Sequence, residues 1–368
     1  MAAASAAGAG SRPGDVALAH PPKDGVTAVA FAPKDGSDGL LVSSWDSTLS
    51  LHTGSTGARL VSHAHAAPVL DCCWQTHTAA LTASLDRGVR VVDFGSATST
   101  ATVLGYHGAG VRCVRWSQSH SCAVSAGWDG TVRVWDPRAS KQVAELGLPS
   151  KAFGMDVCVG GVSSGAADAV VVACEGRRLV TLDLRDTSSA AEDREAALKH
   201  QLRCVAAMPG KPAGAAAWGN SGAPGVAIGS IEGRVSLEHL SPAVTGAASA
   251  TPGFAFKCHR RDAGGDAGPV AHPVNAIAFN RRHGTFATGG GDGTVVLWDG
   301  GAKKRLGKPS AAFPTSVSAL AFSHDSSLLA VAVSYAFEAG DIEHPPDAVV
   351  VRRLDDADIR PRAKKASA

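Results

Sequence analysis

The sequence predicts an all-β protein, a seven-bladed β-propeller, from two observations. Short apolar runs typical of strands recur with a tight turn between them, as in VTAVAF…LLVSSWDSTLSLH and VNAIAF…TFATGGGDGTVVLWD. The turn aspartates Asp46, Asp86 and Asp129 lie 40 and 43 residues apart, which is the repeat length of a four-stranded WD-repeat blade. Such blades close into a ring that leaves no long sheet edge unprotected.

Seven units can be counted along the chain. Four have clear strand and turn patterns, and three weaker ones are VVVACEGRRLVTLDLRD, GVAIGSIEGRVSLEHL and VSALAFSHDSSLLAVAVS…AVVVRRL. The fourth unit has Glu175 where a turn glycine or aspartate is more usual, and CVGGVSSGAADA before it is lengthened. The glycine-rich segments PGKPAGAAAWGNSGAPG and RDAGGDAGPVAHP replace ordinary connectors without removing a predicted contact residue.

The repeats set the predicted domain boundaries. We assign residues 24–355 to the propeller, 1–23 to a disordered Ala/Gly-rich tail and 356–368 to a basic C-terminal tail. The first residues lack the apolar region of a secretory signal and the several arginines of a transit peptide. RPRAKKASA at the C-terminus fits either a nuclear address or a solvated tail.

Composition argues against several classes of protein. The net charge is only +2 over 368 residues, which indicates that the protein lacks the broad basic surface needed to bind a nucleic-acid backbone. We therefore expect no direct nucleic-acid partner. No apolar run reaches the ~18 residues of a membrane span. The eight cysteines are scattered in apolar runs such as VLDCCW without paired C-x-x-C motifs, which predicts buried reduced thiols and no metal or cofactor.

Hydrogen-bonded tetrads that pin neighbouring strands are predicted from residue spacing. The most complete set is His107, Ser125, Asp129 and Trp135. The same pattern in the sixth blade predicts His272, Thr288, Asp292 and Trp298. The second blade keeps His65, Thr82 and Asp86 but has Val92 in the tryptophan position.

A Ser/His/Asp hydrolase is the alternative interpretation of these side chains. A catalytic triad needs one set and a separate oxyanion hole, whereas a structural network predicts repeated sets at similar offsets. The sequence also lacks a P-loop and a nucleophile elbow. We therefore expect a protein that is not an enzyme.

Trp45 and Trp128 each stand one residue before a turn aspartate, where the turns of a WD propeller reach its top face. Either ring could pack between blades or lie on that face. Exposed aromatic rings anchor protein interfaces, and two at the same position favour a binding platform.

Several segments resemble the Bub-three family of spindle-checkpoint propellers, from about Asp24 to Leu354. They are VSSWDSTLSL, VRVWDPRAS, LKHQLRCVAAMP, GSIEGRVSLEHL, FAFKCHR, HPVNAIAFNRRHGTFATGGGDGTVVLWD and IEHPPDAVVVRRL. SIEGRV and FKCHR are shared with the sister family of Rae-type mRNA-export factors. EHPPDAVVVR and PPKDGVTAVAFAP favour the checkpoint family, and a Rae-like nuclear-pore factor is the alternative.

The resemblance implies a non-catalytic scaffold. In this family the top face binds the acidic GLEBS segment of Bub-one-type checkpoint kinases and their pseudokinase relatives. It also binds phosphorylated MELT repeats of the outer-kinetochore scaffold, and the proteins help to inhibit the anaphase-promoting complex. The implied location is the nucleus and kinetochore, with a cytoplasmic pool.

The resemblance also implies the site residues. Trp45 and Trp128 match the peptide-contacting tryptophans, whereas Arg203, Arg234 and Lys257 match the cationic contacts to peptide carboxylates or phosphate. All five are expected to bind peptide, and Arg234 and Lys257 are also expected to bind phosphate. Arginine can hold an oxygen pair with two parallel hydrogen bonds, and lysine adds a mobile charge. A single arginine in a turn is usually a solvated charge. We expect these three cations to converge at the top edge of the fifth blade.

A second function class rests on WDPR at 135–138 and LDLR at 182–185. Both fit the W/L-D-x-R pattern of substrate receptors of cullin ubiquitin ligases, in which the arginine contacts the adaptor. The structural alternative is a third strand that ends in a charged turn.

Overall fold

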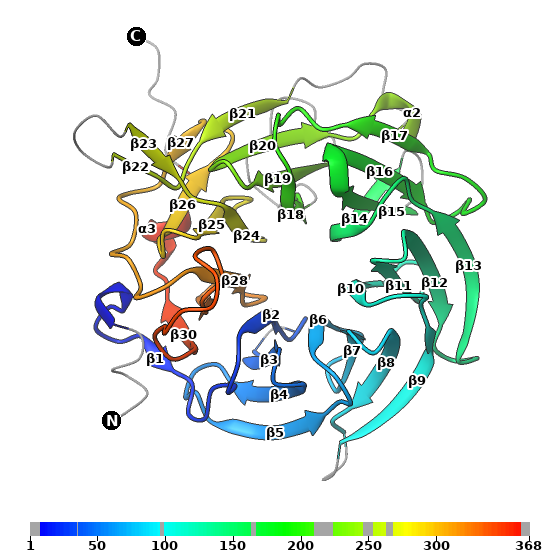
Figure 1. The fold of residues 1–368 in the computed structure, drawn as a ribbon, viewed down its shortest axis with the longest axis horizontal. Coiled ribbons are helices and arrows are strands. Elements are labelled where there is room, and N and C mark those ends of the chain that lie inside the picture. The colour runs from blue at the N-terminus through cyan, green and yellow to red at the C-terminus, as the bar shows by residue number, and fades with distance from the viewer. Residues whose placement is uncertain are drawn as a thin grey trace.

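The predicted seven-bladed propeller is confirmed. The computed structural model describes residues 8–34, 36–95, 99–162, 167–209, 224–245, 253–262 and 268–361. Seven four-stranded antiparallel sheets surround a central axis, and a separate two-stranded sheet lies at the outer rim (Figure 1).

Six blades contain strands in chain order from the axis outwards. The first holds β2 (Val26–Phe31), β3 (Gly39–Ser44), β4 (Thr48–Thr53) and β5 (Arg59–Ala64), and the second β6 (Val69–Trp74), β7 (Ala79–Ser84), β8 (Gly88–Asp93) and β9 (Thr100–Tyr106). The third holds β10 (Val111–Ser117), β11 (Cys122–Gly127), β12 (Thr131–Asp136) and β13 (Lys141–Gly147), and the fourth β14 (Ala152–Val162), β15 (Ala167–Cys174), β16 (Arg178–Asp183) and β17 (Glu192–Glu195). The fifth holds β18 (Leu202–Ala207), β19 (Gly225–Ser230), β20 (Arg234–His239) and β21 (Phe254–Lys257), and the sixth β24 (Val274–Phe279), β25 (Phe286–Gly290), β26 (Val295–Asp299) and β27 (Lys304–Arg305).

The seventh blade joins the two ends of the chain. It holds β28 (Val317–Phe322), β29 (Leu328–Val333) and β30 (Ala348–Arg353), and its outermost strand is β1 (Val16–Ala17). Val16 pairs with Val351, and the buried Arg352 guanidinium lies 2.7 Å from the Asp15 carboxylate. The prediction of a disordered tail over residues 1–23 is therefore wrong for this part of it, while residues 1–7 lie outside the described chain.

The C-terminal boundary also needs correction. Helix α3 (Asp356–Ile359) follows β30, and its Ile359 side chain is buried. The Thr285 hydroxyl donates to the Ile359 carbonyl at 2.7 Å, and His283 Nε2 lies 2.7 Å from the Asp356 carboxylate. The buried Ile359 side chain and these two contacts hold the start of the predicted tail against the propeller. Residues 362–368 lie outside the described chain.

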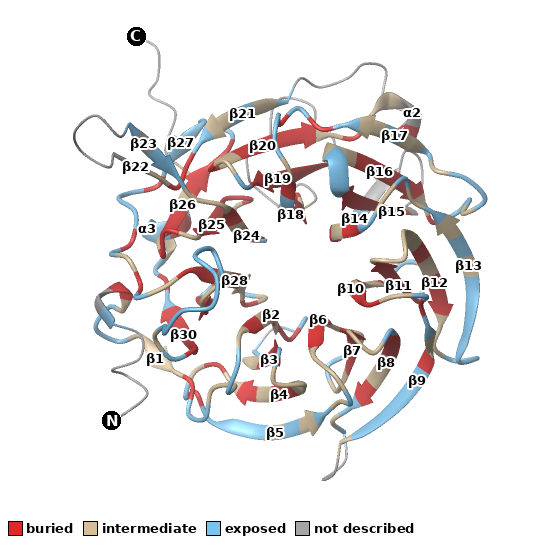
Figure 2. Cartoon of the chain, viewed as in Figure 1, coloured by how far each residue is buried: buried red, intermediate tan, exposed pale blue. Residues whose placement is uncertain are grey.

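The core consists of apolar layers between neighbouring blades. Every residue of β19 and β29 is buried, because middle strands are covered on both faces, whereas the outer strands alternate or face solvent (Figure 2). All eight cysteines are unpaired and buried or half-buried, as predicted. Burial raises the pKa of Cys113 to about 11 and that of Cys72 to about 12.

The three extended or glycine-rich segments are described only in part. β14 and β15 extend the fourth blade as far as residues 162 and 167, and β22 (Arg260–Asp262) pairs with β23 (Pro269–Ala271) between the fifth and sixth blades. Residues 163–166, 210–223 and 263–267 lie outside the described chain. Short helices η1 (Gly8–Gly10), η2 (Glu175–Arg177) and α2 (Pro242–Thr245) complete the elements.

The tetrad in the third blade forms as its spacing predicts. His107 Nδ1 lies 3.1 Å from both Asp129 carboxylate oxygens, and its Nε2 lies 2.7 Å from the Ser125 hydroxyl. Trp135 Nε1 donates to the same hydroxyl at 2.8 Å. These buried bonds join the entry of the blade to its second and third strands.

The tetrad predicted for the sixth blade has the wrong histidine. His259, and not His272, places Nδ1 2.9 Å from Asp292 and Nε2 2.8 Å from the Thr288 hydroxyl. Trp298 Nε1 completes the set by donating to Thr288 at 3.0 Å. The hairpin β22–β23 separates His259 from the inner strand, so the usual spacing points to the wrong residue. In the second blade His65 Nε2 lies 3.0 Å from Thr82, and Arg90 holds Asp86.

Candidate functional site

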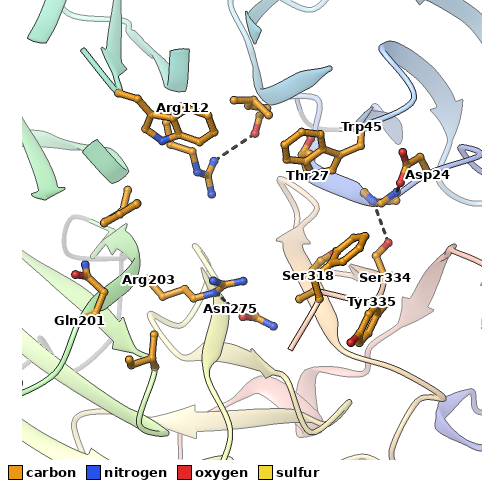
Figure 3. A pocket seen from close by; sticks show the side chains of 18 of the residues that line it. Asp24, Thr27, Trp45, Arg112, Gln201, Arg203, Asn275, Ser318, Ser334 and Tyr335 are labelled. Carbon is orange, nitrogen blue, oxygen red and sulfur yellow. Dashed lines mark hydrogen bonds between the residues drawn. The ribbon is translucent and has the colours of Figure 1, made fainter. Parts of the chain in front are cut away.

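A β-bulge in each inner strand builds a cavity at one end of the propeller axis. The register between first and second strands skips one residue in every blade: Thr27, Leu70, Arg112, Phe153, Arg203, Asn275 and Ser318. A bulged residue leaves the regular ladder and re-aims its side chain. All seven line a cavity of about 670 Å³, which we call the mouth cavity (Figure 3). Each blade therefore contributes one bulged residue to its lining.

The turns after the second strands form the rim of the mouth cavity. Trp45, Trp128 and Ile231 occupy equivalent places, since each backbone amide donates to the segment before its own inner strand, at 3.0, 2.9 and 3.1 Å respectively. All three line the cavity. Trp45 is 42% exposed and Ile231 44% exposed. The structure thus places both predicted tryptophans at one opening, together with an isoleucine that the sequence reasoning missed.

Trp128 is held more tightly than Trp45. It is half-buried, and a Cβ atom at Gly110 would lie only 3.1 Å from its ring. Absence of a side chain at Gly110 therefore leaves room for the indole. Trp45 is the freer of the two rings.

Two guanidinium groups face the mouth cavity. Arg203 Nε donates to the Asn275 side-chain oxygen at 2.7 Å, and Arg112 donates to the Leu70 carbonyl at 3.2 Å (Figure 3). Within the described residues neither forms an ion pair with a carboxylate. Desolvation lowers the pKa of Arg203 and the nearby charge of Arg112 lowers it further, whereas the Glu338 carboxylate raises it without restoring the ordinary value. Two arginines that repel each other favour an anionic ligand between them.

Sequence reasoning missed Arg112, although a signal was present. VRCV at the start of β10 and LRCV at the start of β18 place arginine at the same bulge position. Comparing equivalent positions between blades would have found it.

Arg234 and Lys257 form a second positively charged site in the fifth blade. They are cross-strand partners, Arg234 at the start of β20 and Lys257 at the end of β21. This is the edge at which β18 begins, as predicted. Adjacent strands lie about 4.8 Å apart, so β18 and β20 are separated by about 10 Å. The three predicted cations therefore share an edge but divide into a cavity residue, Arg203, and an outer pair.

The outer pair lies beside a carboxylate that already contacts two arginines and a histidine. Glu232 lies 3.2 Å from Arg234, 3.2 Å from His200 and 3.7 Å from Arg260. Arg260 also donates to the Glu232 carbonyl at 2.9 Å, which joins the segments SIEGRV and FKCHR-R of the sequence. Lys257 is exposed beside this cluster. The single carboxylate of Glu232 does not balance the charges of Arg234, Arg260 and Lys257, so the edge carries positive charge.

The arginines of WDPR and LDLR lie elsewhere. Arg138 and Arg185 follow the ends of β12 and β16, at the opposite edge of their blades from the mouth cavity. Each forms an ion pair with the aspartate two residues before it, at 3.0 and 2.5 Å.

Within the described ranges, no group of three or more His, Cys, Asp or Glu side chains is arranged to hold a metal ion. No helix in the same ranges has the length and apolar character needed to cross a membrane.

Known proteins establish the family. The WD40 family, described as "WD domain, G-beta repeat", matches residues 98–136 and 269–299. The chain is 38% identical to "Mitotic checkpoint protein BUB3.1" of Arabidopsis thaliana over 353 residues, which cover 94% of this chain and 95% of the relative. The chain belongs to the Bub3 family of mitotic checkpoint proteins.

More distant relatives of this Bub3-family chain include both predicted branches. "Mitotic checkpoint protein bub3" of Dictyostelium discoideum is 33% identical, with 91% of this chain and 93% of the relative covered. An "mRNA export factor" of Danio rerio is 31% identical, with 95% and 92% covered. The resemblance inferred from SIEGRV, FKCHR and EHPPDAVVVR is thus confirmed at the level of the Bub3 family.

Proposed function

We propose that this Bub3-family protein is a non-catalytic scaffold whose mouth cavity binds the acidic GLEBS segment of a Bub-one-type checkpoint kinase or of its pseudokinase relative. The observation that carries the proposal is the combination of Arg112 and Arg203 with Trp45 and Trp128 around one cavity. Peptide carboxylates would pair with these two guanidinium groups, and the indole rings would cover apolar side chains. The sequence analysis expects five peptide contacts, Trp45, Trp128, Arg203, Arg234 and Lys257; the first three line the cavity, and Arg112 joins them there.

We propose that the outer pair, Arg234 and Lys257, reads phosphothreonine in MELT repeats of the outer-kinetochore scaffold. Lys257 is exposed, and Arg234 keeps more than a third of its side-chain surface accessible in spite of Glu232. A phosphate carries a charge of about −1.5 to −2 and accepts several hydrogen bonds, which suits a cationic edge with one carboxylate.

The cellular role follows from these two contacts. A propeller that holds a kinase by one segment and a phosphorylated repeat by another would bring that kinase to the kinetochore. The protein would therefore act in the nucleus and at kinetochores, with a cytoplasmic pool, and would delay anaphase by helping to inhibit the anaphase-promoting complex.

Affinity purification from mitotic cells tests this role. Wild-type protein should recover checkpoint kinases, and a Trp45→Ala variant should recover much less of them. Recovery of nuclear-pore components without checkpoint kinases would contradict the checkpoint role and support the export-factor alternative. That alternative is supported by the 31% identity to an mRNA export factor.

A role as substrate receptor of a cullin ubiquitin ligase has weaker support. Its contact arginines, Arg138 and Arg185, are each held by their own aspartate. A pull-down of the cullin adaptor with wild type and with the variant Arg138→Ala/Arg185→Ala tests it. Equal recovery would reject the adaptor contact.

A further inference from the structure

The turn between the second and third strands is much longer in the seventh blade than in the other six. The equivalent connection is 45–47 in the first blade, 128–130 in the third and 231–233 in the fifth. In the seventh blade it runs from 334 to 347, between β29 and β30. We call residues 334–347 the seventh-blade loop. It begins at the mouth cavity, because Ser334, Tyr335, Ala336 and Phe337 all line it.

Side chains of this loop hold it in a defined shape. The Tyr335 hydroxyl accepts the Ala339 amide at 2.7 Å and donates to the Gly340 carbonyl at 3.0 Å. The Tyr335 ring stacks on His344 with centroids 5.2 Å apart, and Phe337 lies 5.4 Å from Tyr335. The Ser316 hydroxyl donates to the Glu338 carboxylate, which ties the loop to the neighbouring connection.

Phe337 is the unusual residue in this arrangement. Its side chain is 60% exposed beside the cavity although the ring is large and apolar. Its backbone lies in the left-handed region with φ of 60°, which is rare and strained for a bulky residue. Strained backbone that the surroundings maintain is concentrated at ligand sites. The loop thus keeps the ring at the cavity although exposure of the apolar ring and the strained backbone are both unfavourable.

We infer that Phe337 is a third aromatic anchor of the mouth cavity and contacts a bulky apolar side chain of the same acidic peptide that enters it. An acidic peptide fits the charge of the site, because Arg112 and Arg203 line the same cavity and neither forms an ion pair among the described residues, although the Asp24 carboxylate also lines it and that of Glu338 lies near Arg203. A bulky apolar side chain fits the rim, because Phe337 lies there together with the exposed Trp45 and Ile231. This inference rests on the proposed function and adds the specificity element that the seventh blade supplies.

The variant Phe337→Gly separates anchoring from folding. Glycine adopts the left-handed backbone without strain, so the unfolding midpoint should stay the same or rise. Binding of a synthetic GLEBS peptide, measured by calorimetry, should weaken by about ten-fold or more if the ring is an anchor. Ile342→Ala is the matched control, because Ile342 is an exposed apolar residue of the same loop that lies outside the cavity lining. Its affinity should equal that of wild type.

Peptide variants identify the side chain that Phe337 contacts. Each bulky apolar residue of the peptide is changed to alanine and titrated against wild type and Phe337→Gly. One such change should weaken wild-type binding yet have little further effect in the variant, because contacting residues are coupled. If Phe337→Gly binds the peptide with wild-type affinity, or if its effect adds fully to that of every peptide change, the inference is wrong while the proposed function stands. A wild-type protein that does not bind the peptide would contradict the proposed function and the inference together.

Discussion

At the scale of single residues, Trp45 and Trp128 occupy equivalent turns but differ in burial. Trp45 is the more exposed, whereas Trp128 packs against Gly110. We predict that Trp45→Ala weakens GLEBS binding by about 2 kcal/mol without lowering the unfolding midpoint, as an interface hot spot does. Trp128→Ala should weaken binding similarly and also lower the midpoint. Calorimetry and thermal unfolding measure the two effects. A folded Trp45→Ala protein with wild-type affinity would reject the contact.

The outer pair in the fifth blade gives a prediction about phosphate. Arg234→Ala and Lys257→Ala should each reduce the preference for phosphorylated over unphosphorylated MELT peptide, because each removes a donor and a positive charge. Titration of both peptides at fixed ionic strength measures this preference. Arg353→Ala is the control, since Arg353 is an exposed arginine of the last strand. If the variants at Arg234 and Lys257 keep the wild-type preference, the phosphate site lies elsewhere.

Two histidines with a lowered pKa, His52 and His65, make stability depend on pH. Desolvation lowers the pKa of His52 and that of His65 to about 4, from an ordinary value of 6.5. Between pH 6.5 and 4 the unfolded chain binds a proton at each histidine that the folded protein does not bind. The free energy of unfolding should therefore fall as the pH falls through this window, by up to about 1.4 kcal/mol per pH unit for each histidine.

Urea unfolding at pH 7.5, 6.5 and 5.5 measures this dependence. His52→Gln removes one titrating group, so its unfolding free energy should fall less steeply below pH 6.5 than that of wild type. Equal pH slopes in both proteins would show that His52 does not contribute.

At the scale of elements, the short strand β1 closes the ring. Its anchor is the ion pair between Arg352 and Asp15, whose side chains are 3% and 5% exposed. Arg352→Ala leaves the Asp15 carboxylate buried and unpaired, so we predict a loss of about 3 kcal/mol or more in the free energy of unfolding. The double variant with Asp15→Ala should lose less than the sum of the two single changes. Strictly additive losses in urea unfolding would contradict this coupling.

The elements also show what the sequence could predict. Alternating apolar runs and regularly spaced turn aspartates are local signals, so seven blades and the His107 tetrad could be recognised from them. β1 has two residues and pairs with a strand at the other end of the chain, so no local pattern indicates it. His259 was missed because the hairpin β22–β23 changes the spacing on which the tetrad pattern depends.

The candidate site was predictable to a similar extent. The resemblance to the family predicted which residues bind, but it did not predict that the cationic residues divide between the mouth cavity and the outer pair. That division depends on which strand carries each residue, as for Arg203 on β18 and Lys257 on β21. Arg112 reaches the cavity because it occupies a β-bulge, and Phe337 because it belongs to a long loop. Both features are recognised only when equivalent positions of the seven blades are compared.

At the scale of the whole molecule, the propeller converts seven similar sheets into one asymmetric cavity. Each blade contributes one bulged residue, and only the third and fifth contribute arginine. Sheets pinned by tetrads and closed by β1 keep these side chains in place before a ligand arrives, which lowers the entropic cost of binding. We expect this fixed pair of cations to recognise an acidic peptide.

The most direct test is a calorimetric titration of a synthetic GLEBS peptide into wild type and into the double variant Arg112→Ala/Arg203→Ala. Arg138→Ala serves as the control, because that arginine lies at the opposite edge of its blade. We predict a loss of affinity of about 100-fold or more for the double variant, with a weaker dependence on salt, and no change for the control. A double variant that binds as tightly as wild type would contradict the claim.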